Sequence, residues 1–300
     1  MSKKSAKKPH LPCFSQWLSA EPTENGKRYL HVLLTELTGV PDEFWQELVE
    51  YIDHAHQGAR NVLRAPLGDG LSPVHYGKEL DPAFGYPHKF DIIALQGFFG
   101  EILTGIIAEN IDLLDNIEWE VPVYLFRAHT TAFQQLEEIK ATDQWDKKIM
   151  GRTGDDGLAF ARDAEGNIVS WMACEAKCTS DHSSALIKDN HEKLSKSRVK
   201  KPVDLLRTIE ALQDYDDDDY AKEWIDALRK LYFETANIKR HDFSVYVCGR
   251  KPVKEKTWIP KDEPHKYYKV KRKLNAAEIQ ILEVADKIKR IYEKLGEIYD

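Results

Sequence analysis

The side chains best suited to chemistry in this 300-residue chain lie in two short stretches near its middle. The first reads GRTGDDGLAF and contains the adjacent Asp155 and Asp156; the second reads WMACEAKC and contains Glu175 and Lys177. Carboxylates are oxygen ligands of the kind that Mg²⁺ prefers, and a bound divalent metal activates water for attack on a phosphodiester. A lysine beside them can orient or deprotonate that water, or act as a point charge on the scissile phosphate. The two stretches therefore predict metal-dependent phosphodiester hydrolysis.

Both stretches have the pattern of β-strands joined by a turn. Residues 157–162 and 168–178 are rich in apolar and β-forming side chains, and residues 163–167 (DAEGN) between them have the composition of a turn. Side chains alternate between the two faces of a strand, so Glu175 and Lys177 project to the same side. We therefore expect a hairpin that carries a carboxylate and a lysine on one face.

The register of this hairpin decides which aspartate lies opposite Glu175. A loop of two or four residues places Asp156 there, whereas an odd number of loop residues places Asp155 or Gly157 there. Asp156 is the preferred partner, and Asp155 is the alternative.

A strongly apolar helix is predicted over residues 91–110, ahead of the hairpin, and it carries Glu101 in its middle. The helical neighbours of this glutamate four and seven residues away are all small. They are Ala94, Gly97, Gly105 and Ala108. Small neighbours let another element come close to the carboxylate. If this helix packs against the hairpin, Glu101 can complete a metal shell or hold one of its waters.

Helices and strands alternate along the rest of the chain. The expected segments are a strand at 119–126, helices at 183–197, 202–213 and 219–233, a strand at 242–249, and a C-terminal helix at about 275–299. Interleaved helices and strands indicate the α/β class, with a mixed central sheet flanked by helices and with helical additions.

These residues resemble the PD-(D/E)xK nuclease superfamily. Asp156 and the pair Glu175 and Lys177 match its core motif residue by residue, and Glu101 matches the glutamate that many members carry on the preceding helix. The proline that usually precedes the aspartate is absent, and Asp155 stands in its place. The resemblance implies a restriction-endonuclease-like core, metal ligands at Asp156, Glu175 and Glu101, catalysis by these residues with Lys177, and Mg²⁺ as cofactor, for which Mn²⁺ can substitute.

A narrower resemblance covers about residues 85–250. The motifs FGEIL (99–103), GDDGL (154–158) and CEAK (174–177), in this order, look like the HamA-like nuclease of Hachiman anti-phage defence. That family implies DNA cleavage with little sequence specificity and a HamB-like helicase subunit that restrains the nuclease. The expected organisation is a flexible basic tail (1–10), an N-terminal helical and loop region (11–85), the nuclease core (86–250), and a basic segment with a C-terminal helix (251–300).

Composition fits an ordered globular protein of the cytoplasm. The chain is 42% hydrophobic and 10% aromatic. We expect no membrane association, because no uninterrupted apolar run reaches the length of a membrane span and the N-terminus lacks a hydrophobic signal segment. Four cysteines are too few for a disulfide scaffold and suit a reducing compartment.

The net charge of −7 argues against a nucleic-acid binder, but the charge is unevenly distributed. Residues 250–273 contain ten Lys or Arg and three acidic residues. Residues 188–201 are also basic, which predicts a face that contacts DNA phosphates. The residues expected there are Lys193, Lys196, Arg198, Lys200 and Lys201. Lys188 is a further site candidate if the helix after the Glu-x-Lys strand faces the metal.

Other interpretations of the same residues stay open. Asp155 and Asp156 suit a turn beside glycine, and Glu175 with Lys177 suits an ion pair at a strand end. The chain would then be a catalytically inactive, nuclease-like interaction subunit. A nuclease acting on RNA is the third alternative.

Overall fold

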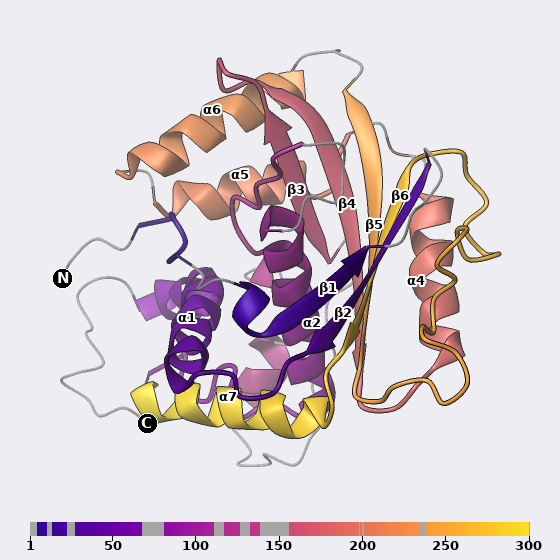
Figure 1. Cartoon of the computed structure of the whole chain (residues 1–300). Coiled ribbons are helices and arrows are strands. Elements are labelled where there is room, and N and C mark those ends of the chain that lie inside the picture. Colours follow the sequence, from indigo (N-terminus) through magenta and orange to yellow (C-terminus); the bar gives the residue numbers. More distant parts are fainter. Residues whose placement is uncertain are drawn as a thin grey trace.

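Within the residues that the structure describes, the protein has a six-stranded mixed sheet flanked by helices, as expected for the α/β class (Figure 1). The computed structural model describes residues 5–10, 14–22, 28–67, 81–110, 117–126, 133–138, 156–197, 199, 201–215, 217–233 and 238–299. The strands are β1 (Leu18–Pro22), β2 (Tyr29–Glu36), β3 (Gly157–Arg162), β4 (Ile168–Thr179), β5 (Lys239–Cys248) and β6 (Leu274–Gln280). The named α-helices are α1 (Asp42–Arg64), α2 (Ile92–Asn110), α4 (Ser184–Lys196), α5 (Leu205–Gln213), α6 (Asp219–Phe233) and α7 (Val284–Tyr299).

The order of strands across the sheet is β1-β2-β6-β5-β4-β3. The four central strands, β2, β6, β5 and β4, are parallel to their neighbours, and β1 and β3 join antiparallel at the two edges. Central parallel strands must be covered on both faces, and helices supply that cover. The predicted mixed central sheet flanked by helices is therefore confirmed.

The β3–β4 hairpin has the register expected from the sequence, although its loop differs. The loop has five residues, 163–167, and Asp163 stabilises it by accepting hydrogen bonds from the backbone N–H groups of Glu165 and Asn167. Pairing then shifts by one residue, because Arg162 pairs with Ile168 but Ala161 pairs with Ser170. This bulge offsets the odd loop length.

Beyond the bulge, Gly157 pairs with Cys174. Asp156 therefore comes level with Glu175, as preferred from the sequence. The predicted position of Asp156 opposite Glu175 is confirmed. The predicted loop of two or four residues is wrong, because the loop has five.

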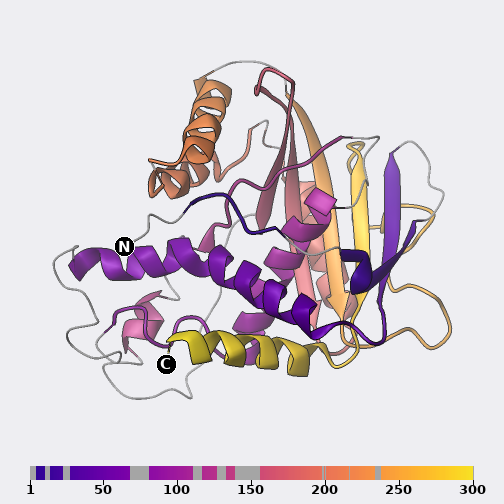
Figure 2. The same cartoon turned by 60° about the vertical axis from the view of Figure 1, so that its left-hand side comes forward.

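One face of the sheet is covered by α2, with α1 and α7 outside it. Figure 2 shows α7 running alongside α1. Gly100 of α2 lies so close to the sheet that an added Cβ atom would be 3.2 Å from Cβ of Cys178 and 3.6 Å from that of Ala176. The even-numbered side chains of β4 therefore face α2. The length and apolar composition of α2 would also suit a membrane span, but 72% of its most apolar stretch is buried inside the fold.

The opposite face of the sheet is covered by α4, α5 and α6. Ile187 and Leu194 of α4 pack in one apolar cluster with Trp171 and Ala173 of β4. Asn190 donates hydrogen bonds to backbone carbonyls of the sheet, including that of Glu175 at 3.1 Å. The odd-numbered side chains of β4, including Glu175, therefore face α4.

Three sequence expectations need correction outside the hairpin. Residues 274–280, expected at the start of the C-terminal helix, form β6 in the middle of the sheet, and α7 follows. The expected strand at 119–126 forms only one isolated bridge, between Glu120 and Phe160. The expected flexible tail is in part held in place, since the backbone N–H of Ala6 donates to Asp218 at 2.7 Å.

Candidate active site

Glu175 is the centre of a charged cluster between β4 and α4. Its side chain is only 1% exposed. One carboxylate oxygen, Oε1, accepts a hydrogen bond of 3.0 Å from the Lys177 ammonium. The other oxygen, Oε2, lies 2.5 Å from the ammonium of Lys193. A carboxylate this deeply buried needs charge partners, and it has two.

Asp156 lies beside Glu175 at the start of β3. Its backbone N–H donates to the carbonyl of Cys174, and its carboxylate accepts a 2.9 Å hydrogen bond from the backbone N–H of Ala176. These contacts fix the aspartate against the strand that carries Glu175. The Lys193 ammonium is 3.6 Å from Oδ1 of Asp156, so one cation contacts both carboxylates.

Lys177 links Glu175 to helix α4. Its ammonium lies 3.0 Å from Glu175 and 3.0 Å from Asp189, whose side chain is 62% exposed. The lysine therefore has one buried and one solvated partner. Asp189 was not anticipated from the sequence as a site residue.

The electrostatics of the cluster follow from burial and from the close carboxylate pair. Burial raises the pKa of Glu175 to about 8, the negative charge of Asp156 adds to this rise, and Lys193 and Lys177 oppose it. Burial acts to lower the pKa of Lys177, but the nearby carboxylates outweigh it and raise the pKa above its ordinary value. The pKa of Lys193 is also raised, since Asp156 and Glu175 outweigh its burial.

Helix α4 presents Lys193, and not Lys188, to the site. It begins after Ser183, whose hydroxyl accepts a hydrogen bond from the backbone N–H of Leu186. Asp189 and Lys193 are four residues apart and so share one helix face. The ammonium of Lys188 lies instead over the ring of Tyr267, 4.9 Å from its centroid. The candidate Lys188 is therefore corrected: α4 does face the carboxylates, but through another lysine.

Glu101 does not join the cluster. Helix α2 packs against the face of β4 that carries Ala176 and Cys178, whereas Glu175 faces α4 on the other side of the sheet. The charge of Glu101 acts on Tyr86 and Tyr292, whose pKa values are raised mainly by burial. The expectation that Glu101 completes a shared metal shell is therefore wrong in this structure.

The remaining sequence candidates lie elsewhere or outside the described residues. Asp155, Arg198 and Lys200 are outside the described residues. Lys196 forms an exposed ion pair of 3.0 Å with Glu192. Lys201 donates a 2.7 Å hydrogen bond to the backbone carbonyl of Tyr232. Of the three of these residues that the structure describes, Lys193, Lys196 and Lys201, Lys193 contacts the carboxylates.

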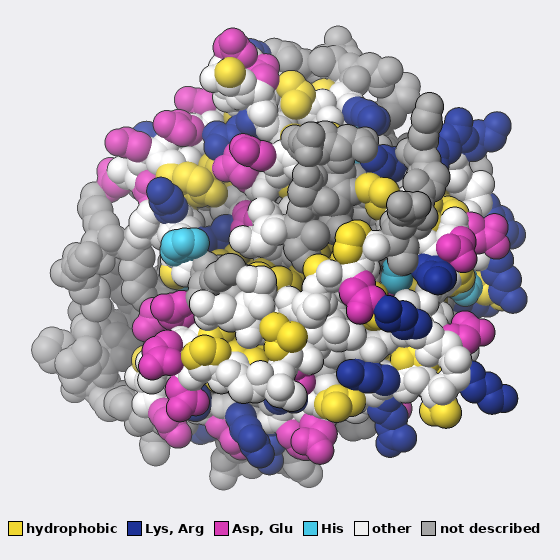
Figure 3. Space-filling model, in the orientation of Figure 1, with side chains coloured by type: hydrophobic (Ala, Val, Ile, Leu, Met, Phe, Trp, Pro, Cys, Tyr) yellow, Lys and Arg dark blue, Asp and Glu magenta, His cyan; other side chains and the backbone are white. Residues whose placement is uncertain are grey.

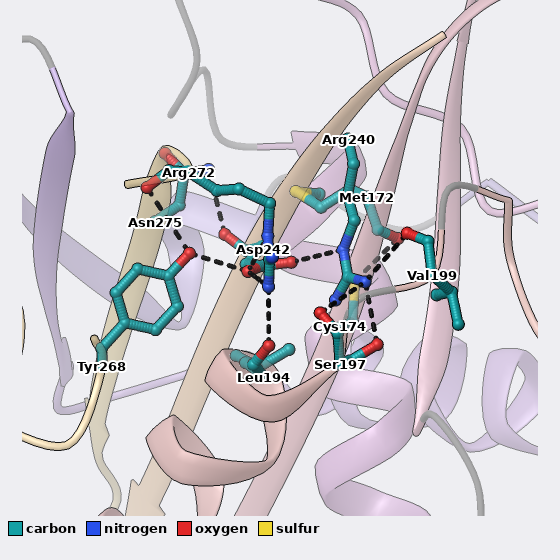
Figure 4. Close-up of polar contacts among 10 residues, drawn as sticks. All are labelled: Met172, Cys174, Leu194, Ser197, Val199, Arg240, Asp242, Tyr268, Arg272 and Asn275. Carbon is teal, nitrogen blue, oxygen red and sulfur yellow. Dashed lines mark hydrogen bonds and ion pairs between the residues drawn. The ribbon is translucent and has the colours of Figure 1, made fainter. Parts of the chain in front are cut away.

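A second charged cluster, centred on Asp242 of β5, holds α4 in place (Figure 4). Asp242 is fully buried and pairs with Arg240 at 2.8 Å and with Arg272 at 2.9 Å. Tyr268 donates a 2.7 Å hydrogen bond to the same carboxylate. This cluster ties the basic segment 250–273 to the sheet, and the sequence did not single it out.

The two arginines of this cluster continue to the end of α4. Arg272 donates to the carbonyl of Leu194 at 2.8 Å, and Arg240 donates to the hydroxyl of Ser197 at 2.8 Å (Figure 4). Cationic donors at a helix C-terminus satisfy its last carbonyl groups. Lys193 lies in this last turn, so the cluster fixes the segment from which its side chain reaches Glu175.

Charge is segregated on the face of the protein that Figure 3 shows. Figure 3 shows Lys and Arg side chains gathered on the side occupied by α4 and the segment after β5, while Asp and Glu side chains are concentrated on the opposite side. The segment 250–273, which carries ten of the basic residues, is fully described and lies against α4 through Arg272 and Tyr267. The basic residues that cluster in the sequence therefore also lie together on this face of the folded protein.

Asp156 and Glu175 fit a Mg²⁺ site of the open kind. Such sites use one or two carboxylates and leave the other positions to water and substrate phosphate. The carboxylates already share one cation, the ammonium of Lys193. Among the residues that the structure describes, no three His, Cys, Asp or Glu side chains gather closely enough to bind a metal. A closed, all-protein metal cage is therefore not indicated in that part of the chain.

No protein-family model matches this chain, and a search of curated proteins finds no similar sequence.

Proposed function

We propose that this chain is a metal-dependent DNA endonuclease with a restriction-endonuclease-like core. The observation that carries the proposal is the grouping of Asp156, Glu175 and Lys177 at one end of the β3–β4 hairpin. Aspartate at the start of one strand and Glu-x-Lys on the next are the elements on which the superfamily resemblance rests. The fold supports the proposal by fixing all three side chains with hydrogen bonds or ion pairs.

The roles in this proposal follow from the contacts. Asp156 and Glu175 would hold Mg²⁺ or Mn²⁺ through their carboxylate oxygens. A bound divalent cation lowers the pKa of its water and offsets the charge of the phosphoryl transition state. Lys177, held between Glu175 and Asp189, would orient the attacking water or contact the scissile phosphate. Glu101, on the other face of the sheet, has no part in this scheme.

DNA is the proposed substrate because a basic surface lies beside the carboxylates. The exposed lysines of α4 and of the segment 250–273 can neutralise backbone phosphates without reading the base sequence. Binding should therefore fall steeply with salt and show little sequence preference.

The biological setting is proposed from the motif resemblance alone. The order of FGEIL, GDDGL and CEAK supports an effector of a prokaryotic anti-phage defence system, acting in the cytoplasm with a HamB-like helicase subunit that controls it. A neighbouring helicase gene would support this setting.

Plasmid nicking tests the proposed activity. Supercoiled DNA and a structured RNA are incubated in parallel with the wild-type chain and with Glu175→Gln, Lys177→Met and Glu192→Gln, with Mg²⁺ or EDTA. We expect Mg²⁺-dependent DNA nicking that is lost in the first two variants. Glu192 is the matched control, because it is a glutamate of α4 that pairs with Lys196. Wild-type nicking rates in Glu175→Gln would refute the assignment, and cleavage of RNA alone would identify a ribonuclease.

One observation favours a second candidate, a catalytically inactive interaction subunit. The charges of Asp156 and Glu175 are already matched by those of Lys177 and Lys193, as in a structural ion-pair cluster. Calorimetric titration with Mn²⁺ distinguishes the two candidates. An inactive subunit should show no metal binding that depends on Glu175, whereas a nuclease should lose its binding in Glu175→Gln even if a partner keeps the isolated chain silent.

A further inference from the structure

Lys193 occupies the space between the two carboxylates of the candidate site. Its ammonium lies 2.5 Å from Oε2 of Glu175 and 3.6 Å from Oδ1 of Asp156. The side chain reaches this position from α4, whose last turn is held by Arg272 and Arg240. The contact is thus made by a fixed helix and not by a loop.

We propose that Lys193 is a built-in competitor of the divalent cation, an inference that rests on the proposed metal-dependent function. A Mg²⁺ ion bound by Asp156 and Glu175 would lie about 2.1 Å from their oxygens. An ammonium in contact with the same two groups fills that space. The metal and this lysine therefore cannot occupy the site together, and Lys193 withdraws when the metal binds.

The second lysine of the site has a different position and a different role. Lys177 contacts Oε1 of Glu175, whereas Lys193 contacts Oε2, and a second ion pair with Asp189 retains Lys177. Lys193 is 38% exposed, so its ammonium can move out toward solvent. Lys177 therefore stays beside the metal site, while Lys193 leaves it.

This arrangement gives the metal-free protein a stable charge balance. Two adjacent carboxylates repel each other, and the buried one is costly when it has no partner. Lys193 stabilises the metal-free state, which binds no divalent cation, so it weakens metal affinity by the same free energy. Lys193 therefore sets a threshold concentration of divalent metal. Below this concentration, the two carboxylates keep the Lys193 ammonium as their cation.

Calorimetric titration with Mn²⁺ tests this competition on the full-length chain. The variants are Lys193→Met, Lys193→Arg and, as the matched control, Lys188→Met, which removes the same charge from the same helix away from the carboxylates. We expect Mn²⁺ to bind about tenfold more tightly to Lys193→Met, the change that corresponds to losing one partly buried ion pair. Lys188→Met should stay within about twofold of wild type, because an exposed charge is screened. Lys193→Arg, which keeps the charge, should bind more weakly than Lys193→Met.

Glu175→Gln separates failure of this inference from failure of the proposed function. If Mn²⁺ binding depends on Glu175 but Lys193→Met binds no more tightly than wild type, the competition is refuted and the metal site stands. If Mn²⁺ binding does not depend on Glu175 in any of these proteins, the competition by Lys193 and the proposed metal site are both refuted.

Thermal unfolding gives a second measurement if Lys193→Met folds poorly. Without metal, this variant leaves two carboxylates with one lysine fewer, and we expect it to unfold at a lower temperature than wild type. Mn²⁺ should then raise its unfolding temperature by more than it raises that of wild type. An equal or smaller rise would overturn the inference, and folding only upon addition of Mn²⁺ would support it.

Discussion

Asp189 of α4 lies 3.0 Å from the ammonium of Lys177 on β4, although the two residues belong to different elements. The same ammonium contacts Glu175, so the lysine is held from the helix side and from the strand side. Its position is therefore set by the packing of α4 on the sheet and not by the hairpin alone.

Asp189→Asn should weaken catalysis more than stability. The pair with Lys177 is largely solvated on the aspartate side, and exposed ion pairs contribute about 0–1 kcal/mol. We expect a small change in the free energy of unfolding, measured by urea denaturation, and a several-fold fall in the nicking rate, because Lys177 loses one of its two anchors. An unchanged nicking rate would show that Glu175 alone positions the lysine.

Glu175 should make the metal-free protein less stable as pH rises from about 5 to about 8. Its pKa is raised from 4.5 to about 8 in the folded protein, so in this window the folded state retains a proton that the unfolded chain has released. Stability therefore falls with rising pH, by up to about 1.4 kcal/mol per pH unit for one proton. The raised pKa of Lys177 acts above this window, since its ordinary value is already 10.5.

Denaturation curves at several pH values, in the presence of EDTA, measure this slope in wild type and in Glu175→Gln. The glutamine cannot ionise, so the variant should have a flatter profile and lose less stability between pH 5 and pH 8. Parallel profiles for the two proteins would show that Glu175 titrates normally.

Metal binding should release protons below pH 8. A metal ligand must be ionised, and burial together with the charge of Asp156 raises the pKa of Glu175 although Lys193 and Lys177 oppose the rise, so a fraction of the metal-free protein carries a proton there. Mn²⁺ titrations at pH 6.5 in two buffers with different ionisation enthalpies should indicate net proton release on binding. Release should disappear near pH 9.5, and a value that is independent of pH would contradict the assignment of Glu175 as ligand.

Asp242→Asn should be among the most destabilising single substitutions on the α4 side of the sheet. It leaves Arg240 and Arg272 without their buried counter-charge, and breaking one partner of a buried ion pair costs about 3–5 kcal/mol. Urea denaturation measures the loss. Asp226→Asn is the matched control, because Asp226 forms an exposed pair with Arg229 and should change stability by less than about 0.5 kcal/mol.

Strand alternation was sufficient to place Glu175 and Lys177 on one face. Side chains two residues apart on a strand always project to the same side, so this prediction needs only that the strand is recognised. The position of Asp156 was predicted correctly for an incomplete reason. The loop at 163–167 is odd, and the bulge between Ala161 and Arg162 restores the register. A bulge depends on local twist and pairing, which loop length does not reveal.

Residues supplied by other elements were not predictable in the same way. The positions of Lys188 and Lys193 in the sequence are equally compatible with a site, and only the rotation of α4 about its axis distinguishes them. The prediction for Glu101 was wrong for a related reason, because the sequence does not show on which face of the sheet a helix packs. A useful signal was the spacing of Asp189 and Lys193, which places an acid and a base on one helix face.

The segment 274–280 (LNAAEIQ) contains good helix formers, so its composition is compatible with the amphipathic helix expected at about 275–299. In the protein it pairs with β2 on one side and β5 on the other, and the hydrogen bonds of a central parallel strand outweigh the intrinsic preference. Propensity could not reveal this, because the partner strands are distant in the sequence.

The central position of β6 has a consequence for the order in which the protein is made. Strand β2 is translated early, yet its parallel neighbour in the sheet is β6, more than two hundred residues later. Such distant pairings form slowly, and a ribosome adds residues one by one. The sheet that supports Glu175 therefore stays incomplete until β6 has been synthesised, long after the strands and the helix that carry the carboxylates and lysines.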